Sequence, residues 1–184
     1  MTTPCELKAL YDRGVNISAY LRQEKGVRGN TVEIIEVAYD LQAGSYIAAM
    51  EDETLAKHQE EYTKEIAKII HSLSLGTPVS ILEAGVGEAT TLSGVLCHLG
   101  TAVNSYGFDL SWSRVLFAKR WLQQQDKPNV TLCTGDMLHV PFSDNSIDVV
   151  YTSHSIELNG ENVEPILREL YRVAKGFLIL LYLL

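Results

Sequence analysis

The chain has few basic residues for its length, and this shortage limits what it can bind. Its 184 residues include 15 lysines and arginines against 23 aspartates and glutamates, so the formal net charge is −8 at pH 7. A protein that neutralises a phosphate backbone needs clustered lysine and arginine side chains. We therefore do not expect a nucleic acid to be the main partner.

Cysteines are scarce as well, and none of them is spaced for metal binding. Cys5, Cys97 and Cys133 are odd in number and lack the close pairs of a structural metal site. The sequence predicts three reduced thiols, as in a cytosolic protein, and no metal centre.

Long hydrophobic runs are also lacking. The longest purely apolar run covers residues 177–184, far short of the ~20 residues that a helix needs to cross a bilayer. The first twenty residues include Glu6, Lys8, Asp12 and Arg13, so they contain no apolar segment typical of an export signal. These observations predict a cytoplasmic protein with no membrane partner.

What the chain does contain is enough apolar sequence for one domain with a core. Hydrophobic residues make up 46% of it and charged residues 21%. Residues 1–75 have helical patterns throughout and predict an N-terminal helical lid. Within this part, Asn30 and Glu33 indicate a capped helix start, and residues 52–73 indicate a longer amphipathic helix. We expect a single domain over residues 1–184.

After Gly76 and Pro78, short apolar runs alternate with amphipathic helices. Strands are predicted at residues 79–83, 103–108, 130–133 and 147–152 and after Gly176, with helices at 90–99, 111–125 and 163–173. Strict alternation with wholly apolar strands indicates a mostly parallel sheet covered by helices on both faces. Residues 76–184 are thus expected to form an α/β core.

A glycine turn lies at the start of this core. Residues 81–91 read Ile-Leu-Glu-Ala-Gly-Val-Gly-Glu-Ala-Thr-Thr, an apolar strand that runs into the turn and opens a helix. Such a turn lets the backbone approach a nucleotide-like ligand closely. Glu83, two positions before the first glycine, would repel a phosphate group and attract a cation. A cofactor with an adenosine end and a cationic end, such as S-adenosylmethionine, fits this turn better than NAD does.

Two further acids follow strands of the predicted sheet. Asp109 ends the strand after the glycine turn, at an offset where an acid accepts hydrogen bonds from ribose hydroxyls. Asp136 follows the third strand and could accept from an adenine amino group, while Met137 packs on the ring. Either acid alone could be a helix cap or a solvated loop residue. Their order and spacing together indicate one binding site at the carboxyl ends of the strands.

These motifs resemble the class I S-adenosylmethionine-dependent methyltransferases, and most closely the branch of the ubiquinone and menaquinone biosynthesis methyltransferases. The resemblance covers about residues 79–180. It depends on Ile-Leu-Glu-Ala-Gly-Val-Gly at 81–87, Gly-Phe-Asp-Leu-Ser at 107–111 and Gly135-Asp136. The segment Pro-Phe-Ser-Asp-Asn-Ser-Ile-Asp-Val-Val at 141–150 is similar to the family's loop into its fourth strand. The resemblance implies a Rossmann-like α/β/α sandwich.

The resemblance also implies roles for individual residues. In the family, the first acid and the glycine turn contact the methionine end of the cofactor, and the second acid contacts the ribose. Leu110 and Met137 would enclose the adenine, Asp136 would hold its amino group, and Ser153 would line the methionine side. The implied cofactor-binding set is Glu83, Ala84, Gly85, Gly87, Asp109, Leu110, Asp136, Met137 and Ser153, with Tyr46 added from the lid.

The chain also departs from the family pattern. Ala89 stands where a third glycine is common, and the usual Pro-Gly-Gly after the last helix is missing. The sequence stops in or just past the fifth strand, where the family continues through two more. We expect a C-terminally shortened chain whose last strand, 177–184, is an apolar sheet edge, unless a partner subunit covers it as in a homodimer.

His154, just past the fourth strand, is the candidate catalytic residue, since methyl transfer to a hydroxyl or a protonated amine needs a base. It could equally be a polar residue of the cofactor wall. In the lid, a glycine lies between Tyr39 and Tyr46. Either ring could face a sulfonium through a cation–π contact, or could be an ordinary packing residue.

The sequence therefore predicts S-adenosylmethionine-dependent methyl transfer to a small-molecule acceptor by in-line displacement. A nicotinamide-dependent oxidoreductase is an alternative, disfavoured by Glu83 and by the incomplete glycine pattern. A second alternative is a cofactor-binding remnant or assembly partner without turnover.

Overall fold

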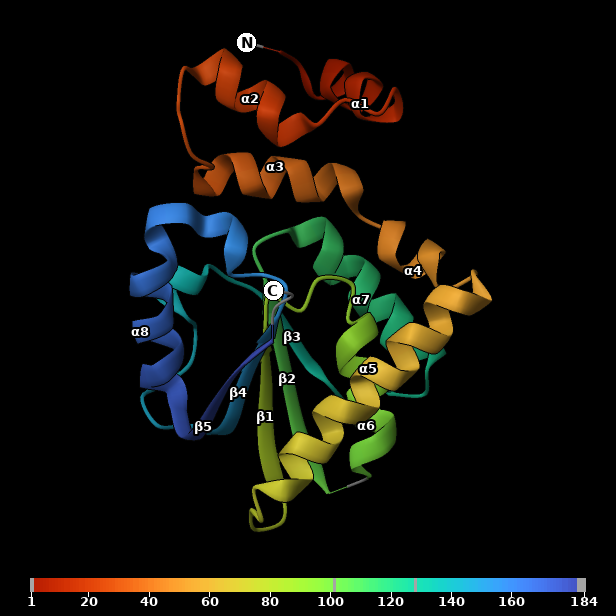
Figure 1. The fold of residues 1–184 in the computed structure, drawn as a ribbon, viewed down its shortest axis with the longest axis vertical. Coiled ribbons are helices and arrows are strands. Elements are labelled where there is room, and N and C mark those ends of the chain that lie inside the picture. The colour runs from red at the N-terminus through yellow and green to blue at the C-terminus, as the bar shows by residue number, and fades with distance from the viewer. Residues whose placement is uncertain (1, 101, 128, 182–184) are drawn as a thin grey trace.

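The computed structural model describes residues 2–100, 102–127 and 129–181, and its centre is a parallel sheet (Figure 1). Five strands pair in the order β3-β2-β1-β4-β5, and every pairing is parallel. The strands are β1 (Val79–Ala84), β2 (Val103–Asp109), β3 (Thr131–Thr134), β4 (Ile147–Ser153) and β5 (Ala174–Leu181). The α/β fold class that the sequence predicts is confirmed.

Helices cover both faces of the sheet, because each strand sends alternate side chains to opposite faces. On one face lie α5 (Glu53–Ser72), α6 (Thr90–Leu99) and α7 (Trp112–Gln124), and on the other lies α8 (Val163–Val173). Ile81 packs with the first group, whereas its neighbour Leu82 packs with α8. The two core clusters account for the apolar runs in the sequence.

The chain changes direction in the sheet next to β1. It runs outward from β1 through β2 to β3, and then crosses back to β4 on the other side of β1. At such a switch point the connections after the two central strands leave in opposite directions, which opens a crevice at the carboxyl ends. Glu83 of β1 lies here, level with Gly107 of β2 and Tyr151 of β4.

Four N-terminal helices lie beyond the crevice, the first two at the top of Figure 1, the third beneath them across the strand ends and the fourth to the side. We call them the covering helices: α1 (Pro4–Asp12), α2 (Ile17–Lys25), α3 (Val32–Gln42) and α4 (Ser45–Ala49). The first three share a small core of their own, formed by Leu7, Ile17, Leu21 and Ile34. The Ser111 hydroxyl, which caps α7, donates a hydrogen bond to Asp40 of α3 and so ties the covering helices to the sheet layer.

The predicted lid of residues 1–75 extends too far. It includes α5, whose Ile66 and Ile70 are buried in the core cluster with Ile81 and the helix α6. An amphipathic pattern shows that a helix has a buried face but not what covers that face. The first half of α5 still lines the crevice, with Leu55, His58, Gln59 and Tyr62, whereas its second half packs on the sheet layer.

Two element ends also differ from the sequence prediction. The cap of α3 is Thr31, whose hydroxyl accepts from the backbone of Ile34, so the predicted cap at Asn30 is wrong by one residue. The fifth strand begins at Ala174, before Gly176 rather than after it. Residues 182–184 of that predicted strand lie outside the described residues.

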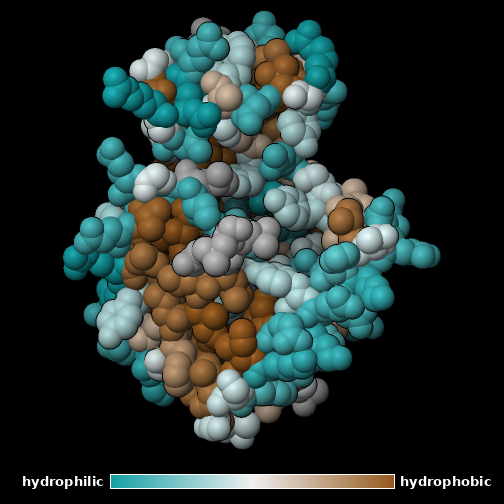
Figure 2. Space-filling view, in the orientation of Figure 1, coloured by the Kyte–Doolittle hydropathy of each residue, from teal (hydrophilic) through white to brown (hydrophobic). Residues whose placement is uncertain are grey.

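β5 forms an edge of the sheet. Figure 2 shows hydrophobic side chains gathered on the surface that faces the viewer, over the sheet and beside α8. Phe177 and Leu180 of β5 are 40% and 37% exposed. Among the described residues, no helix is long and apolar enough to cross a membrane.

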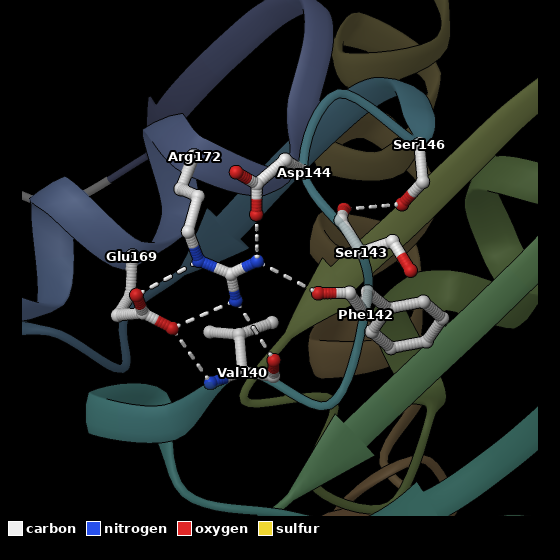
Figure 3. A network of polar contacts seen from close by, with 7 residues as sticks. All are labelled: Val140, Phe142, Ser143, Asp144, Ser146, Glu169 and Arg172. Carbon is white, nitrogen blue, oxygen red and sulfur yellow. Dashed lines mark hydrogen bonds and ion pairs between the residues drawn. The ribbon is translucent and has the colours of Figure 1, made fainter.

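A polar network at the amino ends of the strands, opposite the crevice, holds the loop that leads into β4 (Figure 3). Arg172 of α8 donates from Nε and Nη2 to the two carboxylate oxygens of Glu169, each at 2.9 Å. It also donates to the backbone oxygens of Val140 and Phe142 and, at 2.7 Å, to Asp144. The Arg172 side chain therefore binds two positions, Phe142 and Asp144, of the loop segment that resembles the methyltransferase family.

Candidate functional site

A cavity of about 460 Å³ lies between the carboxyl ends of the strands and the covering helices. Its wall includes these residues of the predicted set: Tyr46, Glu83, Gly85, Gly87, Asp109, Leu110, Asp136, Met137, Ser153 and His154. They come from four strand ends, those of β1, β2, β3 and β4, and from one covering helix, α4. The structure thus brings together side chains that are more than a hundred positions apart in the sequence.

Ala84 is the exception. Its side chain is fully buried in the core cluster on the α8 face, because it alternates with Glu83 along β1. Its backbone oxygen accepts a hydrogen bond from Ser155, whose side chain lines the cavity. Ala84 therefore positions the wall of the cavity and does not contribute a side chain to it.

Glu83 is a buried carboxyl group at the centre of the cavity wall. Only 2% of the residue is exposed, and Oε2 accepts a hydrogen bond from the Tyr151 hydroxyl at 3.1 Å. Burial raises the pKa of Glu83 from 4.5 to about 8, because the charged form loses its hydration. The carboxyl therefore holds a proton at neutral pH, and a cation that entered the cavity would favour its charged form.

The Asp109 carboxylate links the glycine turn to the end of β2 by hydrogen bonding. Its two carboxylate oxygens accept from the backbone N–H groups of Gly87, at 2.8 Å, and Ser111, at 2.9 Å. Burial raises its pKa, while these two hydrogen bonds and the charge of Arg114 oppose that rise. Each oxygen keeps a lone pair that a ligand hydroxyl could use.

The glycine turn needs glycine for steric reasons. Gly85 has φ +74°, and a Cβ placed on it would lie 2.6 Å from Met137 Cε and from the Ser155 side chain. Gly87 has φ +52°. Ala89, in the place where the family commonly has a third glycine, adopts the same left-handed region with φ +59° and is fully buried. The turn thus keeps the backbone conformation of a three-glycine turn although alanine is disfavoured there.

The segment after β3 forms a short wall of the cavity. The Asp136 carboxylate caps the 3₁₀ turn Met137–His139 by accepting from the backbone of Leu138 at 2.9 Å. Met137 extends from this turn toward Gly85, and Leu110 lines the cavity next to Asp109. The arrangement is compatible with a flat ring between Leu110 and Met137.

The far wall is formed by the end of β4 and by α5. The hydroxyls of Ser153 and Tyr62 lie 2.8 Å apart and share a hydrogen bond. His154 has φ +51°, and its ring stacks on that of Tyr62 with centroids 5.8 Å apart. Its Nδ1 lies 3.8 Å from a carboxylate oxygen of Glu157. The cavity wall therefore contains an imidazole, and the Glu157 carboxylate lies close behind it.

The covering helices contact two residues, Glu88 and Arg114, that the sequence analysis did not place in the site. The Glu88 carboxylate accepts from the backbone N–H groups of Gly44, at 2.9 Å, and Ile47, at 2.8 Å. This holds the turn between α3 and α4 against the start of α6. Tyr39 and Tyr46 lie with their ring centroids 4.2 and 4.7 Å from the guanidinium carbon of Arg114. The cation beside Tyr46 is thus one of the chain's own side chains.

Arg114 was missed although the sequence contains a signal for it. It shares one face of α7 with Ala118 and Leu122, at the spacing of successive helical turns, and both of those residues are buried. An arginine on the buried face of an amphipathic helix needs an explanation, because arginine is rarely buried without a partner.

A parallel sheet with a cavity at its carboxyl ends, walled by a glycine turn and two strand-end acids, defines a nucleotide-cofactor-binding α/β domain. Comparison with known proteins narrows this class. The family model described as "Methyltransferase domain" matches residues 81–176, a little over half of the chain. The chain therefore belongs to the methyltransferase domain family, and its resemblance to class I S-adenosylmethionine-dependent methyltransferases is confirmed.

Two groups of similar proteins agree with this assignment. Demethylmenaquinone methyltransferase of Listeria welshimeri is 28% identical over 115 residues, which are 62% of this chain and 47% of that protein. The protein of the same name in a Geobacillus species is 29% identical over 77 residues, 42% of this chain and 32% of that protein. The chain spans about half the length of the curated relatives it matches.

Among solved structures, a SAM dependent methyltransferase from Aquifex aeolicus has a TM-score of 0.52 at 24% identity, covering 61% of each chain. Phosphoethanolamine N-methyltransferase 2 of Haemonchus contortus, solved with S-adenosyl-L-methionine, has a TM-score of 0.50 at 22% identity, covering 57% of this chain and 24% of that one. At these identities the likeness supports the fold.

Proposed function

We propose that the protein binds S-adenosylmethionine in this cavity and transfers its methyl group to a small-molecule acceptor by in-line displacement. The observation that carries the proposal is Glu83, a buried carboxyl whose pKa is raised to about 8 next to a turn that excludes side chains. Such a group favours a ligand that brings a positive charge. Beside the glycine turn, a pyrophosphate would face the carboxyl groups of Glu83 and Asp109.

The residues of the cavity fit the parts of this cofactor. Glu83, the backbone at Gly85 and the Ser153 hydroxyl would hold its methionine end. Asp109 would accept from the ribose hydroxyls, with the Gly87 backbone beside it. The adenine would lie between Leu110 and Met137, with its amino group at the Asp136 carboxylate.

When bound, the cofactor supplies an already activated methyl group on a sulfonium, so the protein needs mainly to orient the acceptor and exclude water. His154 would accept a proton from a hydroxyl or a protonated amine of the acceptor. Glu157 would orient the imidazole through Nδ1 and leave Nε2 facing the cavity. The base is needed only for acceptors that lose a proton.

The identity of the acceptor is not carried over from the relatives. Those proteins are named for demethylmenaquinone, and the match covers less than half of their length. The wall of the cavity combines aromatic, acidic and methionine side chains. We include a quinol ring among the acceptors to be tested.

Three further statements stay proposals. Residues 1–184 act as one domain, with the covering helices closing the cofactor cavity. Two chains associate as a homodimer through β5, where the exposed Phe177 and Leu180 support an interface. The cytoplasmic location stays a prediction from the sequence.

The binding step is tested by calorimetric titration of the chain with S-adenosylhomocysteine and, separately, with NADH. We expect saturable binding of S-adenosylhomocysteine with release of about one proton at pH 7, because its ammonium group would favour the charged form of Glu83. Titrations in buffers of different ionisation enthalpy measure that proton. The Glu83→Gln variant should bind more weakly and release none. Binding of NADH without S-adenosylhomocysteine would reject the proposal.

The catalytic step is tested by following S-adenosylhomocysteine formation with a panel of hydroxyl, amine and quinol acceptors. The His154→Asn variant should lower kcat for hydroxyl acceptors by about 100-fold or more and leave cofactor affinity unchanged. An unchanged kcat would make His154 a residue of the cavity wall. Saturable cofactor binding without transfer to any acceptor would instead indicate a binding protein without turnover.

A further inference from the structure

Arg114 is a buried cation in the cavity that no part of the proposed cofactor site uses. It lies in the first turn of α7, is 7% exposed and belongs to the cavity wall. The aromatic rings of Tyr39 and Tyr46 lie against its guanidinium, with their centroids 4.2 and 4.7 Å from the guanidinium carbon. The N–H donors point outward in the guanidinium plane, along its edge, where polar partners bind.

Within the described part of the chain, this edge has no hydrogen-bond partner. The Nε and Nη2 atoms are buried and unpaired. The nearby carboxylate of Asp109 is already used by Gly87 and Ser111, and the carboxylate of Glu88 by Gly44 and Ile47. Leaving buried donors unpaired costs about 1–3 kcal/mol per group and more for charged groups, so such donors in a cavity indicate a ligand.

A second arginine in the same protein shows what these atoms can hold. Arg172 uses the same two nitrogens, Nε and Nη2, to bind both oxygens of the Glu169 carboxylate (Figure 3). The guanidinium fork matches the geometry of a carboxylate or a phosphate. Arg172 finds this anion within its own helix, whereas among the described residues no carboxylate makes an ion pair or hydrogen bond with Arg114.

The way to this edge passes Gly87 and Tyr46. Nη1 of Arg114 lies on the cavity side, 3.4 Å from where a Cβ on Gly87 would be. Tyr46 lies against the guanidinium and is itself 51% exposed. A rotation of this exposed ring would open the neighbouring Nη2 to a ligand that has reached Nη1.

We propose that Arg114, between Tyr39 and Tyr46, binds an anionic group of the methyl acceptor, a carboxylate or a phosphate. The inference rests on the proposed function, which places the cofactor's methionine end at Glu83 and Ser153 on β1 and β4. Arg114 lies on α7, after β2, and contacts the covering helices. The acceptor is thus an anionic small molecule held under α3 and α4.

The test uses the full chain and three probes of similar shape: benzoate, phenyl phosphate and the neutral benzamide. Binding is followed by NMR chemical-shift titration, with and without saturating S-adenosylhomocysteine. We expect the two anions to bind about tenfold or more tightly than benzamide, because charge-assisted bidentate hydrogen bonds are the stronger kind. The Arg114→Met variant should remove this preference, and Arg114→Lys should keep only part of it.

The matched control is Arg120→Met, which removes an exposed arginine from the same helix. It should leave the affinity for all three probes unchanged. Urea unfolding of each variant checks that the fold is intact.

Equal binding of benzoate and benzamide to the unaltered chain, or an anion preference that survives in Arg114→Met, would overturn the inference. So would a loss of S-adenosylhomocysteine affinity in Arg114→Met with unchanged affinity for 5′-methylthioadenosine, since Arg114 would then bind the cofactor's own carboxylate. If S-adenosylhomocysteine fails to bind the unaltered chain, the proposed function fails. The titrations without it still measure whether Arg114 selects anions.

Discussion

The polar groups at the two ends of the sheet differ in how completely they are paired. At the amino ends of the strands, Arg172 binds Glu169, Asp144 and two backbone oxygens. Asp148 there accepts from both the backbone and the hydroxyl of Ser80, at 2.9 and 2.7 Å. At the carboxyl ends, Arg114 has unpaired donors and Glu83 holds a single hydrogen bond from a side chain.

The pKa values follow the same division. Hydrogen bonds from Arg172 lower the pKa of Glu169, and those from Ser80 lower the pKa of Asp148. Burial instead raises the pKa values of Glu83 and Asp109. The amino ends of the strands therefore stabilise the charged forms of their carboxyl groups. At the carboxyl ends, burial disfavours the charged forms of Glu83 and Asp109.

This difference separates structural groups from groups that await a ligand. A network whose donors and acceptors are all paired stabilises the fold and needs nothing more. Buried groups that are left without partners next to a cavity are most simply explained by a ligand that completes them. The difference between the two ends thus supports a ligand-binding role for the carboxyl ends of the strands, independently of any similarity to other proteins.

The largest expected effect concerns Glu83. Its folded pKa of about 8 lies above the ordinary value of 4.5, so the folded state binds more protons than the unfolded state between these values. The stability that this group contributes is fully present below pH 4.5 and is lost as the pH rises through 8, on the order of 5 kcal/mol in total. Urea unfolding at several pH values measures the decline.

The Glu83→Gln variant removes this titration and should flatten the curve over the same window. The pKa values of Glu169 and Asp148 at the amino ends are lowered, so these two acids titrate below this window. A decline of equal size in Glu83→Gln would show that Glu83 is already charged in the folded protein, and the comparison of the two ends would then fail.

The next effect contrasts the two arginines. Arg172→Met should lower the free energy of unfolding by about 3 kcal/mol, because it leaves two backbone oxygens without their side-chain donor and the Glu169 carboxylate with only the Val140 N–H. Arg114→Met should change it by less than about 1 kcal/mol, because loss of the ring contacts is offset by removal of unpaired donors. Urea unfolding at pH 7 compares the two variants directly.

An equal loss of stability in both variants would mean that Arg114 is a structural residue. Anion binding gives an independent check. Arg172→Met should keep the affinity of the unaltered chain for benzoate, provided that it is measured where the variant is folded.

The smallest effect concerns Asp148. Asp148→Asn should lower stability by about 1 kcal/mol at pH 7, since the amide oxygen can keep only part of the Ser80 contacts and loses the charge near Lys175. The folded pKa of Asp148 is lowered, so its contribution is present above the unfolded value of 3.8 and is lost as the pH falls through the folded value. The difference between the variant and the unaltered chain should therefore shrink in acid. A constant difference would contradict the assigned role.

The sequence predicted the sheet well because its strands are short, apolar and separated by capped helices. Ser111 caps α7 and Asn16 caps α2, as expected from side chains that can accept from the third backbone N–H group after them. The place of α5 could not be predicted in this way. Its pattern of Ile66 and Ile70 predicts a buried face, and only the folded chain decides whether that face packs on the sheet or on the covering helices.

The candidate site was predictable where it lies on strand ends and not where it lies on the covering helices. Glu83, Asp109 and Asp136 follow strands, so parallel topology alone places them at one edge. Ala84 was included because it neighbours Glu83, although the alternation of a strand turns its side chain to the other face. Arg114 could have been noted from its spacing with Ala118, but its partners Tyr39 and Tyr46 are about 70 positions away in the sequence.

The amino-acid sequence by itself determined the succession of strands and helices along the chain, the left-handed glycine turn and the family. These features depend on local sequence pattern and backbone sterics. Only the tertiary structure decided which charged groups are paired. Burial and hydrogen bonding depend on neighbours that are distant in the chain, as between Tyr151 and Glu83 or between Tyr39 and Arg114. The two arginines therefore differ in role: Arg172 stabilises the fold, whereas Arg114 is a candidate ligand-binding residue.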